Sequence, residues 1–255
     1  MLARARSLLP NGGLDLVRQL VLFCGAYWMY QLVRGAVDGR SGAAFDNARE
    51  VISIERGLGL FIEPSVNAWA TTHEWIGDIA AWMYVNAHFV VTAVALAWIY
   101  LRRNDRFYFV RNMFMVAMGL ALVLYALVPT APPRMLPEWG FSDSVASFTG
   151  VDHDTGSVSL LFNPYAAIPS MHVAFSLMLG VTMAHLVRRP WARALWYAYC
   201  PIVTFVVIAT ANHFWIDGFF GAVVAAVSAT TAWSLFARAR PEAWGWNAQP
   251  GTALP

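Results

Sequence analysis

The chain has 255 residues, of which 58% are hydrophobic and only 13% are charged. Soluble domains average about 45–50% apolar and about 25% charged residues, so this composition excludes an ordinary soluble domain. The net charge of +2 gives no support for nucleic-acid binding. All 17 basic residues are arginines, which excludes a lysine Schiff base or a lysine phosphate clamp.

Six apolar segments follow one another, each close to the roughly 20 residues that cross about 30 Å of hydrocarbon. Long apolar runs without strand alternation predict helices, because a helix satisfies its own backbone hydrogen bonds in lipid. We therefore predict an all-α, polytopic membrane protein with six transmembrane helices, at Leu14–Val33, Ile76–Leu101, Phe107–Val128, Met171–Val187, Ala192–Ala211 and Trp215–Ala237. Residues 1–240 are predicted to form one membrane domain, followed by a disordered cytoplasmic tail, residues 241–255.

The arginines are divided unequally between the two sides that six spans define. The two ends of the membrane domain and the connections after the second and fourth spans, together with the span residues next to them, hold twelve arginines, and the opposite side holds five. Arginine favours the cytoplasmic side, so both termini are predicted to be cytoplasmic and residues 35–75 and 129–169 to be external loops of a cell-membrane protein. In the first loop, Phe45, Ala48 and Ile52 share one face of Phe45–Arg56, which predicts an amphipathic helix lying on the outer membrane surface.

Three short polar stretches fall on this predicted external side, namely Pro129–Arg134, Asn163–His172 and Asn212–Asp217. His213 and Asp217 are four residues apart, so one helical turn places them on the same face, where a carboxylate fixes the tautomer of an imidazole. His172 falls in the first turn of a helix that Pro169 and Ser170 are suited to start. Unpaired backbone N–H groups at such a helix start favour an anion.

Two histidines, a carboxylate and an arginine together are suited to phosphoryl transfer. One histidine would attack phosphorus and the other would protonate the leaving oxygen, while Arg134 offers a forked donor for phosphate oxygens. No histidines and carboxylates on the predicted external face have metal-ligand spacing, so neither a metal nor another cofactor is expected. A lone buried histidine is more often structural, which we expect of His185. His88, inside the second span, has either a helix–helix contact or a pocket role.

Two of these stretches resemble signature motifs of the type 2 phosphatidic acid phosphatase superfamily, which comprises integral-membrane lipid phosphatases and phosphotransferases. Pro169-Ser170-Met171-His172 resembles the second motif, and His213-x-x-x-Asp217 resembles the third. Pro132-Pro133-Arg134 falls where the first motif is expected. The resemblance implies that His213 is the nucleophile that forms a phosphohistidine, that Asp217 orients it, that His172 is the general acid, and that Ser170 and Arg134 contact the phosphate.

The chain also departs from these motifs. Leu127 stands where the first motif has a lysine, Met171 where the second has a glycine, and Val206-Val207 where the third has Ser-Arg. This pattern is similar to the branch that includes inositol phosphorylceramide synthase, in which a phospho-headgroup moves between lipids. The residues that could compensate for the missing cations are the neutral donors Asn212, Asn163 and Tyr165 and the arginines Arg49 and Arg56, which share a helix face. A solvated position on anionic headgroups is the alternative for these two arginines.

The function expected from the sequence is cleavage or transfer of a phosphoester group of a phospholipid or polyprenyl phosphate at the external membrane face. The sequence leaves open whether water or a second alcohol accepts the phosphoryl group. The alternative is a non-catalytic membrane transporter or scaffold. A transporter would show paired halves or broken spans in corresponding positions, and neither is visible in the sequence.

Overall fold

The computed structural model describes residues 9–37, 40–149 and 165–239 of the chain. Within these residues the protein is helical, and the only β-type pairing is an isolated parallel bridge between Thr130 and Ala166. The predicted tail, residues 241–255, lies outside the described residues.

All six predicted apolar helices form. They are α2 (Gly12–Val37), α5 (Glu74–Trp82) continued by η2 (Met83–Ala87) and α6 (His88–Arg102), α7 (Asn104–Leu127), α10 (Met171–Leu186), α11 (Pro190–Ala209), and α12 (Trp215–Thr231) continued by η5 (Ala232–Ala239). Four of them are long and apolar enough to cross a membrane: Glu74–Arg102, Asn104–Leu127, Pro190–Ala209 and Trp215–Arg238. These four helices identify an integral membrane protein. Crossing by α10, which has 16 residues, and by α2, which carries Asp15, Arg18 and Gln19, stays a prediction.

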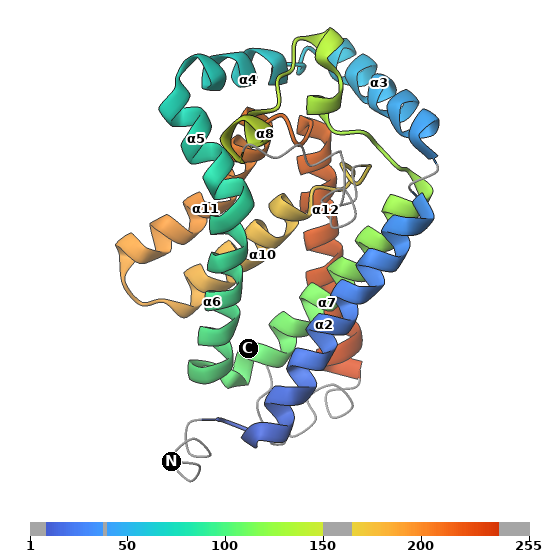
Figure 1. Cartoon of the computed structure of the whole chain (residues 1–255). Coiled ribbons are helices and arrows are strands. Elements are labelled where there is room, and N and C mark those ends of the chain that lie inside the picture. The colour runs from blue at the N-terminus through green and yellow to red at the C-terminus, as the bar shows by residue number, and fades with distance from the viewer. Residues whose placement is uncertain (1–8, 38–39, 150–164, 240–255) are drawn as a thin grey trace.

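The main core lies where α6, α7, α10 and α12 meet. Phe114 of α7 stacks on Phe175 of α10 with ring centroids 4.8 Å apart, and Leu179 and Ala225 are buried beside them. The helix α2 packs along α7 (Figure 1). Its buried Asp15 accepts hydrogen bonds from Tyr100 and Tyr108 at 2.9 and 3.0 Å, so these polar contacts fasten α2 to α6 and α7.

Shorter elements cover one end of this bundle (Figure 1). They are α3 (Ser41–Gly57), α4 (Glu63–Thr72), the 3-10 turns η3 (Pro133–Met135) and η4 (Pro137–Trp139), and α8 (Ser144–Thr149). The beginning of α2 and the red end of the described chain lie at the opposite end of the bundle (Figure 1). The two predicted loops, in their described parts, are therefore largely a helical cap over one end.

The predicted amphipathic helix is found as α3, but its apolar face is turned toward the protein. Ala44, Ala48 and Ile52 are fully buried in a cluster with Leu136 and Phe214. The expectation that this face lies on the membrane is wrong, because the loops beneath α3 offer it an apolar surface that a sequence pattern alone does not reveal. The position of α3 relative to the membrane stays a prediction.

Candidate active site

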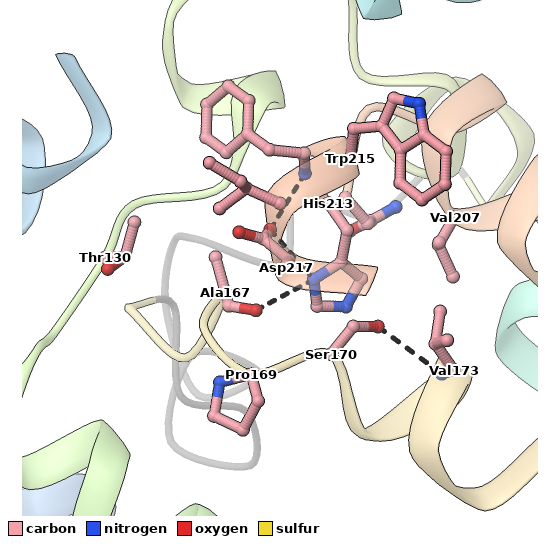
Figure 2. A network of polar contacts seen from close by, with 12 residues as sticks. Thr130, Ala167, Pro169, Ser170, Val173, Val207, His213, Trp215 and Asp217 are labelled. Carbon is pink, nitrogen blue, oxygen red and sulfur yellow. Dashed lines mark hydrogen bonds and ion pairs between the residues drawn. The ribbon is translucent and has the colours of Figure 1, made fainter. Parts of the chain in front are cut away.

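The three polar stretches meet beneath the helical cap. Thr130 donates its backbone N–H to Tyr165 at 2.9 Å and accepts one from Ala167 at 3.2 Å, so the first stretch runs beside the second. Ser170 donates its backbone N–H to the carbonyl of Asp217 at 2.9 Å, which joins the second stretch to the third. The predicted convergence of the described parts of these stretches is thus present in the fold (Figure 2).

His213 is held through one ring nitrogen. Its Nδ1 lies 3.0 Å from the carbonyl oxygen of Ala167 and 3.2 Å from Oδ2 of Asp217 (Figure 2). Since both partners are acceptors, Nδ1 must carry the proton, and Nε2 then holds the lone pair. Asp217 is fully buried, and its Oδ2 also accepts the N–H of Phe214 at 2.8 Å. The carboxylate therefore fixes both the start of α12 and the tautomer of His213.

His172 lies close to this pair, in the first turn of α10. Its ring centroid is 5.8 Å from that of His213, and it stacks on Tyr84 at 4.5 Å with an interplanar angle of 23°. The Nε2 atom of His172 is buried and has no hydrogen-bond partner among the described residues. A polar atom in this state is costly unless a ligand or water supplies the partner, so this nitrogen is available to a bound group.

A cavity of about 50 Å³ adjoins His172 between η2, α6, α10 and α11. His88 lines this cavity and lies 3.1 Å from the hydroxyl of Tyr199 through Nδ1. The His88 ring centroid is 4.8 Å from that of His172. Val206 and Val207, the two positions that depart from the third motif, also line the cavity. A valine therefore lines the cavity next to the candidate site where the resemblance leads one to expect an arginine.

A sequence model described as the PAP2 superfamily matches residues 49–231, well over half of the chain. The chain belongs to the PAP2 superfamily. The match includes all three polar stretches and the elements that position them, apart from the first part of α3. No curated protein and no solved structure matches the chain. Membership of the superfamily indicates phosphoesterase or phosphotransferase activity on lipids.

In this PAP2 protein Arg134 is anchored to the turn that precedes His213. Its backbone N–H donates to Ala211 at 2.8 Å, two residues before His213. Its guanidinium pairs with Asp143 at 3.4 Å, and the side chain is only 10% exposed. The backbone of the first-motif arginine therefore lies close in space to the start of the third stretch. Its contact with phosphate stays a prediction.

The predicted neutral donors have different structural positions. Ser170 is the N-cap of α10, and its Oγ accepts the N–H of Val173 at 3.5 Å (Figure 2). Asn212 directs Nδ2 to the carbonyl and hydroxyl oxygens of Thr210, at 3.1 and 3.0 Å, so it braces the turn before His213. Tyr165 packs edge-on against Phe45. The predicted donor Asn163 lies outside the described residues.

The two arginines of α3 have partners away from the histidines. Arg49 pairs with Asp46 at 3.0 Å, and both side chains are more than half exposed. The guanidinium of Arg56 lies 5.5 Å from the ring centroid of Trp139. No group of three or more His, Cys, Asp or Glu residues that could hold a metal ion occurs in the described part of the chain.

Sequence reasoning missed two acidic residues of the cap, Glu55 and Glu63. Glu55 accepts the backbone N–H of Ile216 at 2.8 Å, and Glu63 accepts that of Trp215 at 2.7 Å. Both glutamates are at most 1% exposed. One signal was available: Glu55 continues the helical spacing of the buried positions Ala48 and Ile52, and a carboxyl on an apolar face needs a partner.

Proposed function

We propose that this PAP2 protein transfers a phospho-headgroup from a phospholipid to a second lipid alcohol through a phosphohistidine on His213. The observation that carries the proposal is the anchoring of Nδ1 by Ala167 and Asp217. It leaves Nε2 with a lone pair directed away from the carboxylate (Figure 2). An imidazole held in this way is a nucleophile whose positive charge, once it bonds to phosphorus, is balanced by Asp217.

His172 is proposed to act as the general acid that protonates the leaving group. As Nε2 of His213 bonds to phosphorus, the bond from phosphorus to the lipid oxygen breaks, and His172 gives that oxygen a proton. In the second step the acceptor alcohol loses its proton to His172, its oxygen bonds to phosphorus, and the P–N bond breaks. Protons and bonds balance over the two steps. The proximity of the two rings and the unpartnered Nε2 of His172 support this assignment.

The proposed phosphate site uses the start of α10 and Arg134. Met171 and His172 occupy the first positions of the helix after the Ser170 cap, and N–H groups there lack intrahelical acceptors. They favour an anion at this place. Arg134 adds a forked donor, and Ser170, Asn163, Asn212 and Tyr165 are proposed as neutral contacts.

The cation content of the site favours a phosphodiester over a monoester. A monoester dianion benefits from several cations, whereas a diester carries one negative charge. Val207 and His172 line the same apolar cavity, and Leu127 ends α7 with 66% of its surface exposed. Two cationic positions of the motifs are thus apolar here. The similarity to the inositol phosphorylceramide synthase branch points the same way.

The site is proposed to face the external side of the membrane. Twelve of the seventeen arginines lie at or near the termini and the connections that share their side in the six-span topology. The site lies under the cap, at the end of the bundle away from the start of α2 (Figure 1). Cytoplasmic termini and an external site agree with this arrangement.

Product analysis of the purified protein in detergent tests the proposal. Given phosphatidylinositol and a lipid alcohol, the protein should form a new phospho-headgroup lipid. A lipid phosphomonoester should release little inorganic phosphate. Phosphate release from the monoester with no headgroup transfer from the diester would overturn the transfer reaction. His213→Ala should abolish turnover, and His185→Ala, a matched change of the exposed histidine of α10, should leave turnover intact.

A further inference from the structure

Two carboxyl groups from the cap hold the first turn of α12. The N-cap of α12 is Phe214, so Trp215 and Ile216 are the first two helical residues and their N–H groups have no acceptor within the helix. Glu63 of α4 accepts from Trp215 and Glu55 of α3 accepts from Ile216, at 2.7 and 2.8 Å. Two separate helices thus supply the acceptors for consecutive N–H groups beside His213.

The remaining oxygens of the two carboxyls are both buried in the interior. Each Oε2 is buried and has no hydrogen-bond partner among the described residues, and the carboxyl of Glu63 is near enough to that of Glu55 to raise its pKa. Two ionised carboxylates in contact repel, whereas one shared proton gives an O–H···O⁻ bond and satisfies both oxygens. Burial raises the pKa of Glu55 to about 8; the Ile216 N–H lowers it, and the charge of Glu63 raises it further.

We propose that Glu55 and Glu63 share one proton and act as positioning residues that hold His213 and Asp217 in place. Loss of this proton then turns the enzyme off at alkaline pH. The inference rests on the proposed role of His213 and adds a pH control to it. No substrate atom needs to touch either glutamate.

The two N–H groups that the glutamates hold belong to the short segment of chain between the two reacting residues. Trp215 and Ile216 lie between His213 and Asp217 in the chain, so a shift of their N–H groups moves the nucleophile and its carboxylate partner. When the shared proton is lost, the repelling carboxylates can separate only by moving α3 from α4 or by releasing one N–H of α12.

The electrostatic surroundings oppose a second negative charge. The charged groups that act on Glu55 are Glu63 and Asp217, and both raise its pKa. Two arginines of the cap have other partners: the guanidinium of Arg56 lies over Trp139, and that of Arg134 pairs with Asp143. An added negative charge next to Asp217 would also disfavour the anionic substrate.

The pH dependence of turnover tests this proposal. Wild-type kcat/KM should fall about tenfold from pH 7 to pH 9, as expected for one group with a pKa near 8. Glu55→Gln keeps an oxygen for Ile216 and offers Glu63 an N–H donor at every pH. It should therefore retain activity at pH 7 within about threefold and lose the alkaline decline. The exposed Glu50→Gln change on the same helix should leave the decline in place.

A stability measurement separates this inference from the proposed catalytic role. An unfolded Glu55 loses its proton near 4.5 and the folded one near 8, so the stability given by the shared proton is full below pH 4.5 and is lost as pH rises to about 8. The folding equilibrium should weaken by up to about tenfold per pH unit in this window. This slope should persist in inactive His213→Ala and become shallower in His213→Ala/Glu55→Gln. If Glu55→Gln does not fold, Glu63→Gln serves in the same comparison. An unchanged slope or an unchanged alkaline decline in the glutamine variants would overturn the proposal.

Discussion

The helices α10 and α12 approach each other closely at Gly221. A Cβ added there would lie 2.4 Å from the carbonyl oxygen of Ser170 and 3.3 Å from the nitrogen of Ala174. Real Cβ contacts are essentially never shorter than 3.0 Å, so Gly221→Ala must separate α12 from the start of α10 by at least about 0.6 Å. Overpacking of this kind costs about 1–3 kcal/mol, which exceeds the roughly 0.5–1 kcal/mol gained from alanine in a helix.

The displaced atom is the N-cap carbonyl of α10, two residues before His172. Because catalytic geometry tolerates little displacement, we expect kcat of Gly221→Ala to fall about 10- to 100-fold, together with a lower unfolding temperature. Steady-state kinetics on a lipid phosphoester and thermal unfolding in the same detergent measure both effects.

Gly218 provides the matched control on the same helix. An added Cβ there would meet the nearest atom, Cγ2 of Val173, at an ordinary 3.6 Å. Gly218→Ala should therefore leave turnover within about twofold and raise stability by about 0.5–1 kcal/mol. A Gly221→Ala protein with wild-type turnover and stability would refute the tight coupling of α12 to His172.

Further changes probe single groups of the site. Asp217→Asn removes the charge that balances the phosphohistidine but keeps a similar shape, so kcat should fall by about 10²–10⁴ in steady-state assays; near-normal turnover would remove Asp217 from the reaction. Arg134→Leu should raise KM and lower kcat, with partial recovery in Arg134→Lys because a lysine lacks the forked geometry. Arg49→Ala breaks only an exposed ion pair and should change stability by less than about 1 kcal/mol, with turnover unchanged; a large rate loss would instead draw Arg49 into the site. Turnover should survive EDTA, and activity that collapses and returns with magnesium would contradict a metal-independent mechanism.

The helices were predictable because hydropathy and length depend on local sequence. All six apolar segments form helices close to the predicted bounds, and α10 begins at Met171 after the Ser170 cap, as Pro169 and Ser170 indicated. The His213–Asp217 contact was predictable for the same reason, since both residues belong to one helical turn. These features need no knowledge of distant parts of the chain.

The parts that were not predictable depend on contacts between distant segments. The acceptor for His213 is the carbonyl of Ala167, 46 residues away, and no side-chain pattern encodes a backbone acceptor. Glu55 reaches Ile216 across 161 residues. The orientation of α3 also depends on a distant segment, since Glu55 of this helix bonds to Ile216 of α12. The sequence predicted which face of α3 is apolar, but it did not predict the surface that covers this face.

Trapping of the phosphohistidine would show whether His213 carries the transferred phosphorus. Protein quenched during turnover of a substrate labelled at phosphorus should hold the label on His213, through a bond that is stable in alkali and labile in acid, as expected for a phosphoramidate. His213→Ala should hold no label and show no turnover. Unlabelled wild-type protein under turnover, or an active His213→Ala variant, would contradict the account.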